Sequence, residues 1–179
     1  MQLTGKEIIG KGIISNYTEE AIQQQGIDVR LESIAQLDAC NRWFAGPMDK
    51  CGYIPMKGKT TIPKTINEDP EFINNVAGPG NPYTLTPGYY EVTLMEGCEI
   101  PANATLHFKT RSSLVRCGAI VHSGQFDAGF KTDKMGCFLQ VMAPIKIEKG
   151  ARIAQALVFT SNDVENLYDG QWQNDKQRK

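Results

Sequence analysis

The hydrophobic positions of the first thirty residues follow a helical pattern and then a strand pattern. Thr4 with Glu7 three residues later is a capping-box pair, and apolar residues follow it at positions 8, 9, 13 and 14. This pattern predicts a short helix, and residues 18–22 predict a second helical turn. Residues 26–31 then alternate apolar and polar side chains, which indicates a half-buried strand.

From Tyr83 onward the pattern is that of short strands. Alternating or apolar runs predict strands at residues 90–94, 105–109, 118–122, 137–142, 145–147 and 153–159. Strands this short at roughly even spacing favour a mainly β fold, a jelly-roll-like barrel or sandwich. We expect one domain over residues 1–179, with an irregular insertion rich in Pro and Gly at 40–82 and a polar, mobile tail at 161–179.

Composition narrows the partners that the chain can have. Its 19 basic and 20 acidic side chains nearly balance, which argues against a surface that coats nucleic acid or a membrane. No apolar run approaches the ~20 residues of a membrane span, and the N-terminus lacks the apolar segment of a signal peptide. The 5 cysteines form no C-x-x-C pair, so neither a disulfide framework nor a zinc ribbon is indicated. We expect a cytoplasmic protein.

Two segments are rich in groups that bind phosphate. Residues 111–116 read Arg-Ser-Ser-Leu-Val-Arg, and residues 150–155 carry Arg152 and Gln155 on a predicted strand. Guanidinium groups bind phosphate oxygens in pairs of hydrogen bonds, and hydroxyls add further donors. The first segment is therefore a candidate triphosphate cradle; the alternative is that both segments only line solvated faces.

Two further segments combine aromatic rings with a carboxylate or a polar tail. Asp127 lies in a turn before Phe130, where a carboxylate can orient and deprotonate water or merely cap the turn. Tyr168 and Trp172 stand in the polar C-terminal tail. They can fold over a planar base and exclude water, or simply hold the terminus in place.

The order and spacing of these segments resemble the successive motifs of the trimeric dUTPase and dCTP deaminase superfamily. Residues 26–30, 111–116, 124–130 and 150–155 are similar to its first four motifs. Residues 3–9 and 168–173 look like the branch of dCTP deaminases and archaeal dUTPases, and the Gly-rich terminal motif of common dUTPases is absent. The resemblance implies a distorted, dUTPase-like β-barrel and a homotrimer with sites at subunit interfaces.

The resemblance also implies roles for individual residues. Asp127 would hold the water that attacks the α-phosphate, and Phe130 would stack beneath the deoxyribose. The backbone of residues 118–126, with Gln125 beside it, would form a hairpin that reads the pyrimidine edge, and Tyr168 and Trp172 would close over the nucleotide. Mg²⁺ would sit on the triphosphate without protein ligands. The phosphates would be held by Arg111, Ser112, Ser113, Arg116 and Gln155.

One departure bears on the choice between the two activities of the superfamily. A glutamate ten residues beyond the third-motif Asp moves protons at the pyrimidine C4 in the deaminases, and a gapless count from Asp127 reaches Cys137. A thiol with a pKa near ~8.5 replaces that carboxylate poorly. The sequence therefore predicts a dUTP diphosphatase that forms dUMP and pyrophosphate. The alternatives are a dCTP deaminase or bifunctional enzyme, and a catalytically decayed nucleotide-binding regulator, which the departures Thr132 and Gln171 keep open.

Overall fold

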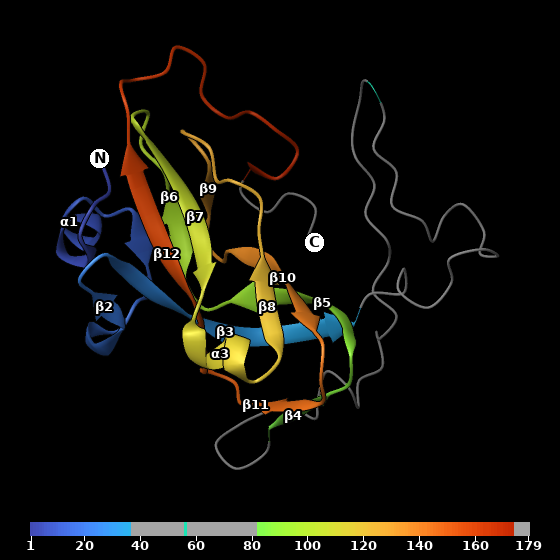
Figure 1. Cartoon of the computed structure of the whole chain (residues 1–179). Coiled ribbons are helices and arrows are strands. Elements are labelled where there is room, and N and C mark those ends of the chain that lie inside the picture. The colour runs from blue at the N-terminus through green and yellow to red at the C-terminus, as the bar shows by residue number, and fades with distance from the viewer. Residues whose placement is uncertain (37–55, 57–81, 174–179) are drawn as a thin grey trace.

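Antiparallel strands make up most of the computed structural model, which describes residues 1–36, 56 and 82–173 (Figure 1). The largest sheet has the strand order β7-β12-β3-β5-β10-β8, and β2 pairs with β3 at its side. The strands of this sheet are β2 (Ile22–Gln23), β3 (Gly26–Gln36), β5 (Gly88–Leu94), β7 (Ala104–Thr110), β8 (Ala119–His122), β10 (Gly136–Val141) and β12 (Arg152–Thr160).

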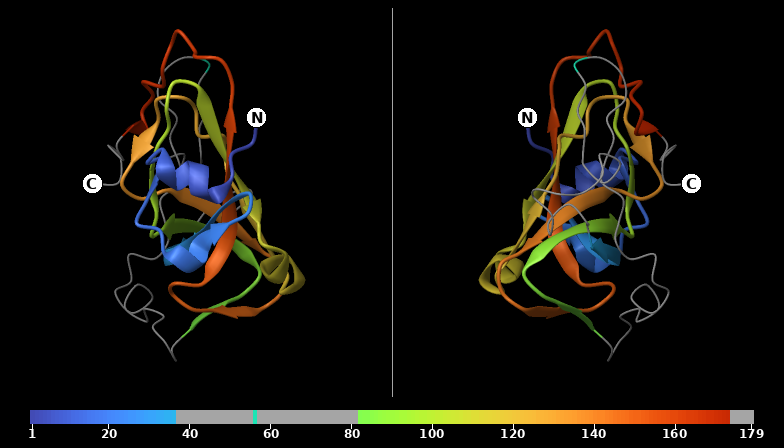
Figure 2. Two further views of the ribbon diagram at one scale, coloured as in Figure 1. Left: turned by 90° about the vertical axis from the view of Figure 1, so that its left-hand side faces the viewer. Right: turned by 90° about the vertical axis from the view of Figure 1, so that its right-hand side faces the viewer.

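The two end strands of this sheet, β7 and β8, come back together. The Thr110 hydroxyl at the end of β7 accepts a hydrogen bond from the Val121 N–H at 3.0 Å and donates one to the Val121 carbonyl at 3.2 Å. One side chain thus bridges the edge strands β7 and β8, and the sheet nearly closes into a barrel. Such closure leaves few unpaired strand edges, as is common in small β proteins. Figure 2 shows the strands wrapping round one interior.

Two smaller sheets cover the ends of the barrel. One consists of β1 (Ile14–Ser15), β6 (Gly97–Glu99) and β9 (Lys131–Thr132), in the order β1-β6-β9. The other pairs β4 (Tyr83–Leu85) with β11 (Ile145–Ile147), at the lower end in Figure 1. These short strands shield the apolar ends of the barrel from water.

The helices are short, and two of them precede β3. Helix α1 (Gly5–Gly10) begins with the expected capping box, since Thr4 N–H donates to Glu7 Oε2 at 2.8 Å and Glu7 N–H donates to the Thr4 hydroxyl at 3.3 Å. A 3₁₀ turn, η1 (Glu19–Ala21), forms where residues 18–22 predict one. The sequence did not predict helix α3 (Ser112–Arg116), because five residues are too few to show a helical period.

The interior is an apolar cluster with one buried ion pair. The cluster takes inward-facing residues from every strand of the large barrel sheet except β2, among them Val29, Leu94 and Leu139, which are fully buried. Glu96 is also fully buried and accepts from the Arg30 N–H at 2.7 Å and the Arg30 Nε–H at 2.6 Å. Burial raises the pKa of Glu96, although the Arg30 contacts oppose this shift. These two bonds tie β3 to the chain just after β5.

The structure confirms the mainly β, barrel-like fold with short N-terminal helices. Each of the six strands expected after Tyr83 is present, with ends that agree or differ by one or two residues, and the strand expected at 26–31 extends to Gln36. The irregular insertion expected at 40–82 lies outside the described residues apart from Met56 and Pro82. In the described part of the chain, no helix has the length and apolar character needed to cross a membrane.

Candidate functional site

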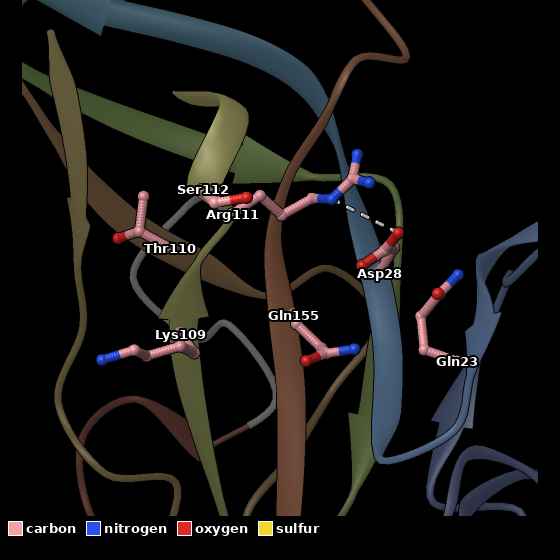
Figure 3. Close-up of a pocket in the computed structure, with 7 residues that line it drawn as sticks. All are labelled: Gln23, Asp28, Lys109, Thr110, Arg111, Ser112 and Gln155. Carbon is pink, nitrogen blue, oxygen red and sulfur yellow. Dashed lines mark ion pairs between the residues drawn. The ribbon is translucent and has the colours of Figure 1, made fainter. Parts of the chain in front are cut away.

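A polar pocket lies where β7, β12 and β3 run side by side (Figure 3). Lys109, Gln155 and Asp28 occupy directly paired positions on these three strands, so their side chains form one row across the sheet. The pocket measures about 240 Å³, which is below the range of ~300–1,000 Å³ for whole drug-sized ligands and suits a part of a nucleotide. Its walls are Gln23, Asp28, Lys109, Thr110, Arg111, Ser112 and Gln155.

Asp28 is the only carboxylate among the residues that line this pocket, and two arginines share it. It is 2% exposed, and its Oδ2 lies 3.4 Å from Arg111 Nε and 3.3 Å from Arg152 Nη1. Burial raises the pKa of Asp28, and the two guanidinium groups pull it down by a smaller amount. Lys109 also lines the pocket, so two cationic walls and the neighbouring Arg152 outweigh one carboxylate, and this excess of positive charge suits a polyanion.

The structure brings only part of the expected phosphate cradle into this pocket. Arg111, Ser112 and Gln155 line it. Ser113 and Arg116 lie on the exposed surface of α3, next to the pocket in the chain but not in its walls. Asp28 and Lys109 were not expected as site residues, although their pairing with Gln155 across neighbouring strands could have suggested them once the register was known.

The hairpin expected at residues 118–126 does not form, and this corrects the sequence-based expectation. Strand β8 pairs with β10 instead, and its other edge is bonded to the Thr110 hydroxyl. After His122 the chain continues without regular structure until Phe126, which exchanges two backbone hydrogen bonds with Leu106. The free edge of β8, where a hairpin partner would have paired, is therefore occupied by the Thr110 hydroxyl.

The chain leaves β8 at the end opposite α3 (Figure 1), and Asp127 and Phe130 lie in the turn that follows. The Asp127 side chain is exposed and accepts a hydrogen bond from Gln125 Nε2 at 2.7 Å. The Phe130 N–H donates to the Asp127 carbonyl at 3.0 Å, which closes the turn, and Gly129 adopts a φ of +84°. Neither Asp127 nor Phe130 lines the arginine pocket.

Aromatic rings connect this turn to the C-terminal tail of the same chain. Phe126 contacts Phe108 at 5.1 Å and Phe130 at 5.4 Å, and Phe130 contacts Tyr168 at 5.3 Å between ring centroids, all edge to face. Trp172 is partly buried against the hydrophobic core, and its backbone N–H donates to the Tyr168 hydroxyl at 3.3 Å. Phe130 is only 9% exposed, and the Tyr168 ring contacts it edge to face, so the tail helps to bury the ring that was expected beneath a sugar.

The sequence-predicted residues therefore form two groups within one chain. Arg111, Ser112 and Gln155 meet at the pocket. Gln125, Asp127, Phe130, Tyr168 and Trp172 gather around the turn that follows β8.

Cys137 occupies a core position. It is 5% exposed on β10, opposite Val92 of β5, while its strand neighbour Phe138 is 38% exposed. Gln140, two residues further along the strand, shares the outward face with Phe138 and contacts His122 at 2.9 Å. Strand alternation directs position 137 inward, so the gapless count from Asp127 reaches a side chain that packs into the core.

A nearly closed antiparallel barrel with a cationic pocket at its strand pairs is the framework of a protein that binds anionic ligands. Comparison with known proteins identifies the group. Residues 3–161 match the family model described as dCTP deaminase-like. The chain therefore belongs to the dCTP deaminase-like family.

Several relatives match most of the chain. A deoxyuridine 5′-triphosphate nucleotidohydrolase of Methanocaldococcus jannaschii is 32% identical over 89% of this chain and 92% of its own length. Proteins named probable deoxyuridine 5′-triphosphate nucleotidohydrolase from Methanosarcina mazei and Halobacterium salinarum are 33% and 30% identical over 88% of this chain, covering 84% and 86% of their lengths.

A solved structure shares the fold. The crystal structure of 2′-deoxycytidine 5′-triphosphate deaminase from Agrobacterium tumefaciens superposes with a TM-score of 0.57 at 18% identity and covers 89% of this chain. Our chain spans about half of that protein, at 48% of its length. This likeness supports the barrel fold.

Proposed function

We propose that the protein is a dUTP diphosphatase, which hydrolyses dUTP to dUMP and pyrophosphate. The observation that carries the proposal is the pocket lined by the cations Lys109 and Arg111 and by one carboxylate, Asp28, which Arg152 also neutralises from outside the walls. The names of the relatives that match more than four fifths of the chain supply the substrate.

The pocket residues would hold the phosphates. Arg111 offers N–H donors that its contact with Asp28 leaves pointing outward, and Ser112 and Gln155 add a hydroxyl and an amide. Ser113 and Arg116 on α3 would reach phosphate oxygens from outside the pocket. Fixed donors of this kind stabilise the charge that develops as the phosphoanhydride breaks, because they need no rearrangement during the reaction.

Asp127 would act as the general base. Its carboxylate is exposed, and the Gln125 amide holds one oxygen, which leaves the other to orient a water toward the α-phosphate. The water's proton would pass to Asp127 as its oxygen bonds to phosphorus, and pyrophosphate would leave. Phe130 would face the deoxyribose once Tyr168 has moved off its ring, and a 2′-hydroxyl would then meet an apolar surface with no partner.

We also propose that the working unit is a homotrimer. Within one chain, the arginine pocket takes Lys109, Thr110 and Arg111 from the end of β7, whereas the Asp127 turn follows Phe126, which pairs with Leu106 in the first half of β7. A nucleotide that contacts both groups can do so where the pocket of one chain meets the turn of another. Cyclic homo-oligomers create such sites at every interface.

Mg²⁺ would enter on the substrate's triphosphate. Among residues 1–36, 56 and 82–173, no three His, Cys, Asp or Glu side chains lie close enough to hold one ion. The pocket's carboxylate, Asp28, is engaged by two guanidinium groups, so the donor set suits phosphate rather than a resident cation. Mg²⁺ commonly binds through substrate phosphates, retained waters and few protein ligands, and it would neutralise charge on the leaving pyrophosphate.

The description of the matching family favours a second candidate, a dCTP deaminase. That reaction needs a group that moves protons at the pyrimidine C4. Cys137 faces the core, and the outward Gln140 amide cannot serve as a general base. A third candidate is a nucleotide-binding regulator that has lost its catalytic activity. The presence of Asp127, Arg111 and Arg116 argues against this candidate.

One incubation separates these candidates. The protein is mixed with each deoxynucleoside triphosphate and with UTP in the presence of Mg²⁺, and the products are resolved by chromatography. We expect dUMP and pyrophosphate from dUTP and little turnover of UTP. Comparable kcat/KM values for UTP and dUTP would contradict the role of Phe130. Formation of uridine nucleotides from dCTP would favour the deaminase. Binding without turnover would favour the regulator.

A further inference from the structure

The tail ends in a glutamine side chain that bonds to the backbone on both sides of Phe130. Gln173 Nε2 donates to the Gly129 carbonyl at 2.8 Å and to the Tyr168 carbonyl at 3.3 Å. Gln173 Oε1 accepts from the Lys131 N–H at 2.8 Å. A primary amide supplies a donor and an acceptor side by side, as a peptide group does, so Gln173 extends the pairing of this turn.

The same turn is held a second time by the other end of the tail segment. The Tyr168 N–H donates to the Ala128 carbonyl at 2.8 Å, and the Tyr168 ring lies against Phe130. Leu167 packs so closely that a Cβ built on Gly129 would lie 2.7 Å from the Leu167 Cβ. Residues 167–173, the docked tail segment, therefore cover the turn that carries Asp127 in their own chain.

The two ends of the docked tail segment differ in what they touch. Tyr168 uses its ring to cover the ring of Phe130, which the sugar would need. Gln173 bonds only to backbone atoms, which a bound nucleotide leaves in place. A substrate can therefore displace the Tyr168 ring without breaking the contacts of Gln173.

We propose that Gln173 is a positioning residue that anchors the tail to the Asp127 turn of the same chain, so that each tail closes over the Asp127 of its own chain. This inference rests on the proposed function for the role of Asp127, and on the hydrogen bonds of Gln173 for the anchor. Gln173 holds the tail backbone, including the Tyr168 carbonyl, while the Tyr168 ring turns away from Phe130 and over the nucleotide.

The anchor is tested on the protein alone by amide hydrogen exchange. Gln173→Ala removes all the side-chain bonds, and Gln173→Glu sets a carboxylate against the Gly129 and Tyr168 carbonyls. We expect the Lys131 amide to exchange roughly tenfold faster or more in both variants, as for a local opening. Asn162→Ala, which removes an exposed amide earlier in the tail, serves as the matched control and should leave the Lys131 amide protected. Unchanged protection of Lys131 in both Gln173 variants would overturn the anchor.

Two differently tagged chains test whether the tail that closes each site comes from the same chain as Asp127 or from a neighbouring chain. One chain ends before Leu167, and the other is full length with Asp127→Asn; they are co-expressed, and tandem affinity purification isolates particles that contain both. If each tail serves its own chain, no site has both Asp127 and a tail, and dUTP hydrolysis stays at the level of the truncated protein. Recovery toward the wild-type rate would show that the tail acts on a neighbouring chain and would overturn the proposal. Size-exclusion chromatography of the wild-type protein first establishes that it is an oligomer; a monomer would mean that a tail can serve only its own turn.

The two tests also separate this inference from the proposed function. If wild-type protein does not hydrolyse dUTP, the function fails, while loss of Lys131 protection in the Gln173 variants still demonstrates the anchor. If wild-type protein hydrolyses dUTP and the Gln173 variants do so at the wild-type kcat/KM, the function stands and the positioning role of Gln173 fails. We expect kcat/KM for dUTP to fall several-fold in Gln173→Ala and to be unchanged in Asn162→Ala.

Discussion

Thr110 and Val121 exchange a pair of hydrogen bonds through one hydroxyl, at 3.0 and 3.2 Å, and these bonds join the last strands of the barrel sheet. Thr110 also lines the arginine pocket and directly precedes Arg111. Closure of the barrel and placement of the pocket therefore depend on the same residue.

Thr110→Val should weaken both properties. Valine keeps the shape of threonine but leaves the Val121 N–H and carbonyl without this partner, so we expect a loss of about 1–3 kcal/mol in the free energy of unfolding. The KM for dUTP should rise as Arg111 becomes less well placed. Urea unfolding and steady-state kinetics measure the two effects. Thr110→Ser retains the hydroxyl and should stay close to wild type in both; equal damage from serine would assign the effect to packing.

Asp127→Asn should abolish most of the chemistry while sparing binding. The amide keeps the size of the side chain but cannot take a proton from water, so we expect kcat to fall by roughly 10²-fold or more. Calorimetric titration with a non-hydrolysable dUTP analogue should give a nearly unchanged Kd. A near-wild-type kcat would reduce Asp127 to a residue that closes its turn.

Arg116→Ala should weaken triphosphate binding without destabilising the protein. Arg116 is exposed on the last turn of α3. Among the residues that the structure describes, it forms no ion pair. Loss of one phosphate contact should raise the Kd of the dUTP analogue by about tenfold, or ~1.4 kcal/mol. The matched change Lys149→Ala removes an exposed cation away from the pocket and should have no such effect. Equal weakening in both variants would indicate general charge attraction.

Cys137→Ala should lower stability and leave dUTP hydrolysis intact. Its side chain is buried opposite Val92, and removal of a buried group costs about 1 kcal/mol or more. Wild-type protein should release no ammonia from dCTP, because a core thiol cannot reach the pyrimidine. Ammonia release that disappears in Cys137→Ala would contradict both statements. Thermal unfolding and a coupled ammonia assay make the comparison.

Asp28→Asn should raise the free energy of unfolding at pH 7 but weaken substrate binding. Burial raises the folded-state pKa of Asp28 above its ordinary value of 3.8, so the folded state holds the proton more tightly than the unfolded chain does. The stabilising effect of this protonation is complete below the unfolded pKa and is lost as pH rises through the folded pKa. Asn resembles the protonated form at every pH.

We therefore expect Asp28→Asn to match wild type in unfolding free energy near pH 3 and to exceed it at pH 7. Its KM for dUTP at pH 7 should rise, since Arg111 and Arg152 lose the carboxylate that orients them. Urea unfolding at the two pH values provides the test. A variant that is less stable than wild type at pH 7 would show that the two arginines outweigh the cost of burial.

The fold could be predicted from local patterns where those patterns were strong. The capping box at Thr4 and Glu7 and the alternation in residues 153–159 appear in the structure as α1 and β12. Helix α3 and the two-residue strands were missed, because so few residues carry no period. Their positions are fixed by long-range contacts that the sequence does not display.

The candidate site was only partly predictable for the same reason. Arg111, Ser112 and Gln155 could be selected by their chemistry, and they meet at one pocket. The inclusion of Lys109 depends on a strand register, which a sequence alone does not state. Position 137 was reached by a count along the chain, whereas its inward orientation is set by the pleat of β10.

Gly129, in the turn that follows β8, is restricted both by its own backbone conformation and by the docked tail segment. Its positive φ of +84° already favours glycine, and the nearby Leu167 leaves no room for a β-carbon. Loss of the tail in the course of evolution would relieve the second restriction but not the first. Descendants without residues 167–173 would then accept asparagine or aspartate at position 129, which tolerate this backbone shape, whereas descendants that keep the tail would not. The residue at position 129 would thus indicate whether a related protein still closes its site with the C-terminal tail of the same chain.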